Sequence, residues 1–286
     1  MKIGVLIPVY NAAKTIGQTL ESVLNQTELP YEICIVDDGS TDETETIVRQ
    51  YAHEDNTILW KIVQKPNGGL GSARNSGLEV MTSDYIALLD ADDVWTPRKI
   101  EHTRSYLESH PETDLLYHPI WEWRSESGMM HKRRDAKLDS IEVIWLKNPI
   151  TPSATVLRKD AMKWEFDTDP NIHGVEDALL WTRAYHDGLN IRRMGFVDTQ
   201  YRVNHGMTKD KSAHDKRIGA ALKKAVEAGW VSEALLSRIS HFRAYHNARQ
   251  FHKAGEFKSA VEAYKNSEVG LKVSMLKTLA SLKIKA

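Results

Sequence analysis

Three carboxylates lie within four residues of one another, at Asp90, Asp92 and Asp93, directly after an apolar run. Acidic groups held this close disfavour one another's ionised form unless a cation or hydrogen-bond donors lie among them. A divalent cation that also contacts phosphate oxygens meets this need, because such ions are bound by carboxylates together with substrate phosphates. The spacing therefore predicts a metal and phosphate site at these three residues.

Two further acidic pairs are candidates for binding and catalysis. Asp37 and Asp38 follow a second apolar run, where a carboxylate can accept hydrogen bonds from a base or a ribose. Glu176 and Asp177 open a predicted helix, and a carboxylate there can act as a general base if it faces a cleft. The alternative for both pairs is ordinary: acidic residues in the first turn of a helix complement its dipole.

A glycine-rich segment, Gly-Leu-Gly-Ser-Ala-Arg at 69–74, precedes another predicted helix. It is not a dinucleotide fingerprint, because Arg74 replaces the third glycine, and it is not a P-loop, because no Gly-Lys-Ser/Thr follows. A glycine-rich turn at a helix N-terminus is suited to an anion, with Arg74 as the neighbouring charge. The alternative is that Arg74 is a plain surface cation.

The elements that must position these residues alternate between strand and helix patterns. Predicted strands cover residues 2–9, 31–36, 57–64 and 85–89. Predicted helices cover residues 15–26, 41–52 and 71–81, the second of them opened by a Ser-x-x-Glu capping box at Ser40. This alternation predicts an α/β fold, a Rossmann-like, mostly parallel sheet flanked by helices. The acids then lie at the carboxyl ends of the strands, where such sheets bind ligands.

The rest of the chain has different patterns. Residues 115–124 and 129–134 predict a β-hairpin, 153–157 a further strand, and 176–186 a helix closed by Gly188. Trp121 and Trp123 share one face of the hairpin and are candidates for stacking an acceptor. From residue 209 on, only helical patterns occur. We therefore divide the chain into an α/β domain, 1–208, and an α-helical extension, 209–286.

Charge divides the chain in the same way. Residues 209–286 carry 16 Lys and Arg against 7 Asp and Glu, whereas residues 1–208 carry 22 against 32. The overall balance is −1, which excludes a general nucleic-acid binder. A basic, partly amphipathic extension fits peripheral contact with an anionic membrane, and it fits a packing or dimerisation helix equally well. The sequence leaves the oligomeric state open.

The cysteine content and the hydropathy of the chain limit its expected cellular location. Cys34 is the single cysteine, which excludes a disulfide framework and a cysteine-rich metal site, and its apolar neighbours predict that it is buried. No stretch is long and apolar enough for a membrane span, and the N-terminal apolar run is too short for a signal peptide. The expected location is the cytoplasm.

Six motifs follow one another along the chain. They are Ile-Pro-Val-Tyr-Asn at 7–11, Ser-Val-Leu-Asn-Gln-Thr at 22–27, the segments 36–42, 67–75 and 88–93, and the pair Glu176-Asp177. In this order they resemble the family 2 glycosyltransferases of the GT-A fold, over residues 1–205. The resemblance implies an inverting transfer from a nucleotide-diphosphate sugar, most often a UDP-sugar, with Mn²⁺ or Mg²⁺. The Gln-x-x-Arg-Trp motif of processive members is absent, which implies a non-processive enzyme.

The resemblance also assigns residues to the donor. It implies that Pro8, Tyr10 and Asp38 lie around the nucleobase, with Asp38 accepting hydrogen bonds from it, and that Arg74 lies near the base or the diphosphate. Asp90 and Asp92 would form the Asp-x-Asp motif at the ribose and the metal.

The remaining assignments concern the metal and the proton. Asp93 adjoins the Asp-x-Asp motif and is included in the predicted metal set. Asp177 would be the catalytic base, with Glu176 beside it in the catalytic pair. A positioned base of this kind accelerates a reaction about 10²–10⁴-fold, and the metal would stabilise the leaving diphosphate.

The sequence thus predicts a hexosyl- or N-acetylhexosaminyltransferase that acts on a glycan or lipid-linked acceptor in surface polysaccharide, glycolipid or lipopolysaccharide synthesis. Two alternatives remain. A sugar-phosphate nucleotidyltransferase uses a similar sheet, but the expected glycine-rich loop after the first strand is absent. A non-catalytic nucleotide-sugar-binding protein would not need both the Asp-x-Asp and the Glu-Asp motifs.

Overall fold

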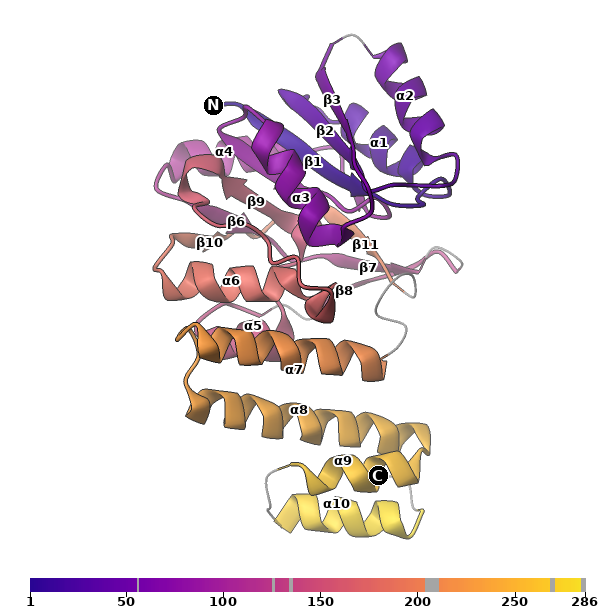
Figure 1. Ribbon diagram of the computed structural model, residues 1–286, viewed down its shortest axis with the longest axis vertical. Coiled ribbons are helices and arrows are strands. Elements are labelled where there is room, and N and C mark those ends of the chain that lie inside the picture. The colour runs from indigo at the N-terminus through magenta and orange to yellow at the C-terminus, as the bar shows by residue number, and fades with distance from the viewer. Residues whose placement is uncertain (56, 125–126, 134–135, 204–210, 268–270, 284–286) are drawn as a thin grey trace.

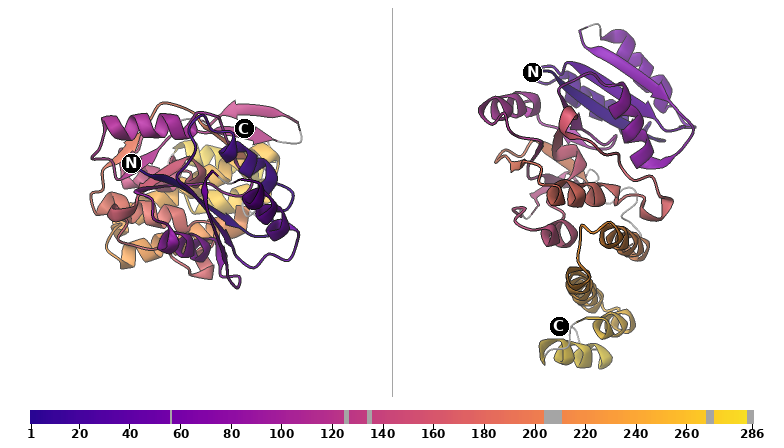
Figure 2. Two further views of the ribbon diagram at one scale, coloured as in Figure 1. Left: turned by 90° about the horizontal axis from the view of Figure 1, so that it is seen from above. Right: turned by 60° about the vertical axis from the view of Figure 1, so that its left-hand side comes forward.

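The computed structural model describes residues 1–55, 57–124, 127–133, 136–203, 211–267 and 271–283. Figure 1 shows an α/β body, with its central sheet in the upper part of the view and a column of helices from the C-terminal part of the chain below it. The right-hand view of Figure 2 shows the same column from a second side, with the yellow C-terminal helices farthest from the indigo strands.

A seven-stranded sheet organises the body in the order β10-β6-β9-β4-β1-β2-β3. Its strands are β1 (Ile3–Val9), β2 (Glu32–Asp37), β3 (Leu59–Gln64), β4 (Tyr85–Leu88), β6 (Leu115–Tyr117), β9 (Thr155–Arg158) and β10 (Ile191–Arg193). All neighbours are parallel except β9, which runs antiparallel to both β4 and β6. The predicted mostly parallel sheet is confirmed, and so is the strand predicted at 153–157, but its antiparallel place between β4 and β6 was not indicated by any local pattern.

Helices cover both faces of this sheet, as predicted. The helices are α1 (Ile16–Leu24), α2 (Thr44–Glu54), α3 (Gly69–Val80), α4 (Lys99–Ser109), α5 (Ile141–Lys147) and α6 (Glu176–His186), with single 3-10 turns at Pro152–Ala154, Lys159–Ala161 and Pro170–Ile172. Because successive strand residues point to opposite faces, Val5 and Ile7 pack with α1, α2 and α4, whereas Leu6 packs with α3 and α6. Cys34 is fully buried in the second of these cores, as expected.

A second, four-stranded sheet lies in the order β5-β11-β7-β8. Its strands are β5 (Val94–Trp95), β7 (Trp121–Arg124), β8 (Met129–Lys132) and β11 (Thr199–Arg202). The predicted hairpin is therefore shorter than expected: its arms are β7 and β8, whereas residues 115–117 form β6 of the main sheet. Residues 125–126 of its turn and 134 of its second arm lie outside the described residues.

The capping box predicted at Ser40 is wrong. Helix α2 begins at Thr44, and the side chain of its N-cap residue, Glu43, forms no capping hydrogen bond. The Ser40 hydroxyl instead accepts a hydrogen bond from the backbone N–H of Asn11 at 3.0 Å, and the Asp42 carboxylate accepts one from the backbone N–H of Thr44 at 3.1 Å. Tertiary contact with the loop after β1 thus replaces the local cap.

The extension is helical throughout its described part, as predicted, with α7 (Lys211–Glu227), α8 (Glu233–Ala254), α9 (Phe257–Lys265) and α10 (Leu271–Ser281). The division at 208 falls within residues 204–210, which are not described. Ile218 and Leu222 of α7 and Ile239 of α8 belong to the same buried core as α6. Tyr264 of α9 and Leu276 of α10 form a separate small core with the end of α8. Among the described helices, none is long and apolar enough to cross a bilayer.

Candidate active site

A cavity of about 1060 Å³ opens at the carboxyl ends of β1, β2 and β4. Eight of the nine sequence-predicted site residues line it, and the ninth, Asp93, does not. The eight are Pro8, Tyr10, Asp38, Arg74, Asp90, Asp92, Glu176 and Asp177. Residues more than 160 positions apart in the sequence are thus brought to one edge of the sheet, where open α/β folds bind ligands.

Asp38 is the anion that occupies the N-terminus of α3. Its Oδ1 accepts hydrogen bonds from the backbone N–H of Gly68 at 2.9 Å and from Lys65 Nζ at 2.6 Å, and its Oδ2 accepts one from the N–H of Gly69 at 2.7 Å. The glycine-rich turn therefore binds a carboxylate of the chain itself. This fixes the Asp38 side chain at the rim of the cavity, with Tyr10 exposed beside the same opening.

Arg74 is buried, so the alternative of a plain surface cation is wrong. Its side chain is 1% exposed and lies between two carboxylates, with Nη2 donating to Asp90 Oδ1 at 2.8 Å and Nη1 donating to Glu176 Oε1 at 2.9 Å. Burial acts to lower the pKa of the guanidinium, but the charges of Asp90 and Glu176 raise it above the ordinary value. The ion-pair chain Asp90–Arg74–Glu176 thus joins the loop after β4 to the first turn of α6.

Asp177 is better placed than Glu176 to accept a proton from a substrate. Both Glu176 oxygens are engaged, since Oε2 also accepts the N–H of Gly174 at 2.5 Å. Burial, and then the charge of Glu176, raise the pKa of Asp177 to about 7, while Arg74 opposes the shift. A carboxyl with a pKa near the working pH is suited to general base catalysis.

The three acids after β4 do not point to one place. Asp93 is fully buried, and its Oδ1 accepts the backbone N–H of Arg202 at 2.8 Å. Burial, with the nearby charges of Asp92 and Asp90, raises the pKa of Asp93 well above its ordinary value. Asp90 and Asp92 line the cavity. In the described part of the chain no group of three or more His, Cys, Asp or Glu side chains is arranged to hold a metal.

The carboxylates of Asp90 and Asp92 are nevertheless suitable ligands for a divalent cation that also binds the phosphates of a nucleotide. Mg²⁺ and similar ions keep several waters and bind one or two carboxylates plus substrate phosphates, without an all-protein cage. Two carboxylates at the wall of an open cavity meet that requirement, and Asp93 is not needed for it. Its inward hydrogen bond to Arg202 instead orients the loop that carries the other two.

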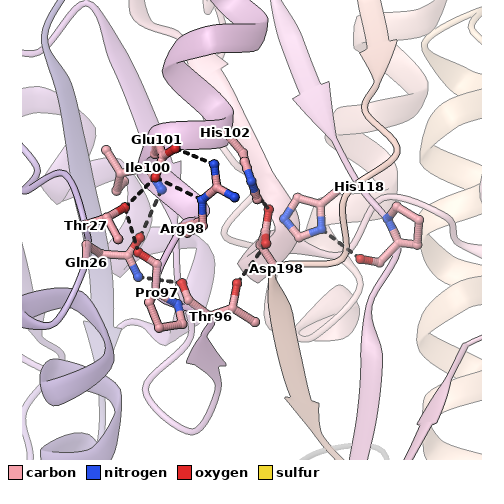
Figure 3. Close-up of polar contacts among 11 residues, drawn as sticks. Gln26, Thr27, Thr96, Pro97, Arg98, Ile100, Glu101, His102, His118 and Asp198 are labelled. Atoms are coloured by element: carbon pink, nitrogen blue, oxygen red, sulfur yellow. Dashed lines mark hydrogen bonds and ion pairs between the residues drawn. The ribbon is translucent and has the colours of Figure 1, made fainter.

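The loop that follows these acids is held by the motif at 22–27, as Figure 3 shows in part. Gln26 Nε2 donates to the carbonyl of Thr96 at 2.7 Å, and its Oε1 accepts the N–H of Ile100 at 3.0 Å. From the other side, Asp198 accepts a hydrogen bond from the Thr96 hydroxyl at 2.7 Å. The motif is therefore a support for residues 96–100, the segment that follows β5.

Several lining residues were not identified from the sequence. The cavity is lined by Glu122, whereas Trp121 and Trp123 on either side of it are not among the lining residues. Alternation along β7 explains this, because neighbouring residues point to opposite faces. The other lining residues that sequence reasoning missed include Arg133, Lys147, Asn148, His173, His214 and Arg243. No local motif marks them, since they come from separate elements.

Solved structures show the same fold. The mannosyltransferase PcManGT of Pyrobaculum calidifontis, in complex with GDP-Man and Mn²⁺, matches 98% of this chain and 80% of that chain, with a TM-score of 0.66 and 20% identity. TarS of S. aureus, in complex with UDP-GlcNAc, matches 99% and 88%, with a TM-score of 0.62 and 21% identity. The fold is therefore of the GT-A glycosyltransferase type.

Sequence comparison gives the family. An uncharacterized glycosyltransferase of Rickettsia prowazekii is 40% identical over 114 residues, which are 40% of this chain and about a third (34%) of that protein. The putative glycosyltransferase EpsE of Bacillus subtilis is 37% identical over 76% of this chain and 76% of its own length. The model of glycosyl transferase family 2 matches residues 4–164. The chain therefore belongs to glycosyl transferase family 2.

Proposed function

We propose that this protein is an inverting, non-processive transferase that moves a hexosyl or N-acetylhexosaminyl group from a UDP-sugar to a hydroxyl of a glycan or lipid-linked acceptor in surface polysaccharide synthesis. The observation that carries the proposal is the ion-pair chain Asp90–Arg74–Glu176, which holds the Asp-x-Asp loop next to Asp177 in one cavity. The UDP-GlcNAc complex of TarS and the Mn²⁺ complex of PcManGT support the choice of donor and metal.

The residues present account for the steps of such a transfer. In this proposal the nucleobase lies against Tyr10 and Asp38, which both line the cavity. Asp177 accepts the proton of the acceptor hydroxyl, whose oxygen attacks the anomeric carbon as the bond to the nucleoside diphosphate breaks, so the configuration inverts. A divalent cation bound by Asp90 and Asp92 would stabilise the charge on the departing diphosphate. Arg74 is ion-paired with Asp90 and Glu176. It therefore holds the Asp-x-Asp loop close to the catalytic base, Asp177.

The first test is thermal unfolding with a panel of nucleoside diphosphates, with and without Mn²⁺. We expect UDP to raise Tm only when Mn²⁺ is present, because a ligand at a hundredfold excess over Kd stabilises the folded state by about 2.7 kcal/mol. Asp92→Ala should abolish the shift, whereas Asp160→Ala, which changes an exposed acid elsewhere, should retain it. A metal-independent shift, or none with any nucleotide, would contradict the proposal.

A second part of the proposal concerns location: a cytoplasmic protein in peripheral contact with the inner face of the cell membrane. The extension carries the positive charge that supports it, and each Lys near an anionic bilayer contributes about 1 kcal/mol. We expect co-sedimentation with phosphatidylglycerol vesicles and little with phosphatidylcholine. Replacing the exposed Lys253, Lys258 and Lys265 with Gln should weaken it strongly. Equal binding to both lipids would refute membrane contact through the extension. Undiminished binding of this variant to phosphatidylglycerol vesicles would refute it as well.

A further inference from the structure

The cavity continues past Asp177 into the helical extension. Beyond the predicted residues it is lined by Lys147 and Asn148 at the end of α5, by His214 and Ile218 of α7, and by Arg243 of α8. Helix α6 contacts both α5 and α7, and its first residue is bound to Arg74. Asp177 therefore lies where the donor residues and this second group of residues meet, and we call the second group the distal end.

The distal end is held by specific contacts. Arg238 of α8 donates two hydrogen bonds to Glu142 in the first turn of α5, at 3.0 and 2.6 Å. Arg243 donates to the carbonyl of Trp145 at 3.0 Å and also pairs with Asp215 of α7. Helix α5 ends at Lys147, and its C-cap residue Asn148 has the left-handed conformation, with φ +39°. Two arginines of α8 thus fix a short helix as a wall of the cavity.

Charge differs between the two ends of the cavity. We call the part of the cavity lined by the residues assigned to the sugar donor the donor end. Acidic residues gather there, and two of them, Asp90 and Asp92, fit a metal. The cations Lys147 and Arg243 line the distal end. Arg133 adjoins them, because its Nη2 lies 3.5 Å from the carbonyl oxygen of Lys147, and it brings with it the lining carboxylate of Glu122.

The acidic residues in the described part of the chain offset only part of this positive charge. Arg243 is balanced by Asp215, and Glu122 lies 3.5 Å from Arg133 Nε but 2.9 Å from His131. Lys147 is exposed at the opening. Among the residues that the structure describes, an excess of positive charge therefore remains at the distal end, carried by Lys147 and Arg133.

The donor does not account for these cations. Its diphosphate would be matched by a divalent cation held by Asp90 and Asp92. A cavity of about 1060 Å³ is also at the upper limit for one small ligand, so there is room for a second substrate next to the first. The group that these cations contact then belongs to the acceptor, whose hydroxyl reacts at Asp177.

We propose that the distal end is an acceptor subsite for an oxyanion, a phosphate or a carboxylate, with Lys147 and Arg133 as its direct contacts. The inference rests on the proposed function, because it assumes that the hydroxyl at Asp177 belongs to the acceptor. The oxyanion comes either from the phosphate of a lipid carrier or from an acidic sugar of a glycan, and both present the same chemistry to these side chains.

The test is calorimetric titration of the full-length protein with UDP and Mn²⁺ in excess, so that the donor end is already filled. The anionic probes are farnesyl phosphate and methyl glucuronide, and farnesol and methyl glucoside are their neutral counterparts. We expect one anionic probe to bind, at least about tenfold more tightly than its neutral counterpart, since a charge-assisted contact is worth that factor or more. The probe that binds identifies the source of the oxyanion.

Variants assign the contact. Lys147→Gln and Arg133→Gln should each weaken the anionic probe about tenfold, while Lys216→Gln, on an exposed position of α7, should have no effect. UDP binding with Mn²⁺ in each variant shows that it is folded. Failure of both anions to bind, equal binding of neutral probes, or unchanged affinity in both variants would overturn the subsite and leave the proposed function standing. Failure of UDP to bind the unaltered protein would overturn both.

Discussion

Replacing Asp177 with Asn is expected to reduce kcat by about 10²–10⁴-fold. The amide cannot accept the proton of the acceptor hydroxyl, whereas the neighbouring Glu176 is engaged by Arg74 and by the N–H of Gly174 and cannot substitute for it. Binding of UDP with Mn²⁺ should be unchanged, because Asp90 and Asp92 are intact. Release of UDP from the donor sugar in the presence of acceptor measures the rate, and calorimetry measures the binding.

The pH dependence gives this prediction a second readout. A general base must be ionised, and the pKa of Asp177 is raised to about 7, so kcat/KM should fall tenfold per pH unit below that value and level off above it. Asp177→Asn should lose this dependence along with the rate. Asp187→Asn, at the C-terminal end of α6, is the matched control and should behave like the unaltered protein. Full activity in the Asp177 variant would show that another group is the base.

Replacing Arg74 with Met should destabilise the folded protein by about 3–5 kcal/mol, because removing one partner of a buried ion pair leaves the other charge uncompensated. Here two carboxylates, Asp90 and Glu176, lose their partner at once. For a chain of this size the loss corresponds to a fall in Tm of roughly 6–20 °C. Urea unfolding followed by circular dichroism measures the free energy directly.

Arg49→Met is the matched control, since Arg49 is 55% exposed and forms an i,i+4 ion pair with Glu45 on its own helix. Such a pair contributes about 0.3–0.5 kcal/mol. Arg74→Lys should fall between the two variants, because an ammonium keeps the charge but not the two-pronged geometry. Because Arg74 also lowers the pKa of Asp177, any activity left in Arg74→Met should require a higher pH. A stability loss no larger than that of Arg49→Met would mean that the ion-pair chain does not support the site.

The parts of the fold that the sequence predicted are those whose signals are local. Strand β1 and helix α6 have contiguous apolar patterns, and the acids at 90–93 and 176–177 directly follow or open such elements. Once the sheet is parallel, its geometry brings these ends together, which is why eight of nine predicted residues line one cavity.

The parts that could not be predicted depend on contacts between distant segments. The four residues of β9 read as a strand, but nothing in them indicates that they run antiparallel between β4 and β6. Asp38 was expected to face a base, and its bonds to Gly68 and Gly69 depend on the packing of two loops. Arg243 enters the cavity wall only because α8 packs on α5.

The separate small core of α9 and α10 has a consequence for how the chain unfolds. Tyr264 and Leu276 pack with Ala248 near the end of α8, apart from the large core that holds Ile239. Small clusters of this kind open in local, sub-global events at a free-energy cost below that of complete unfolding. Amide hydrogens of α9 and α10 should then exchange with solvent well before those of the central sheet. Because Arg243 precedes this cluster, the terminal helices can fray and close again while the wall of the cavity stays in place.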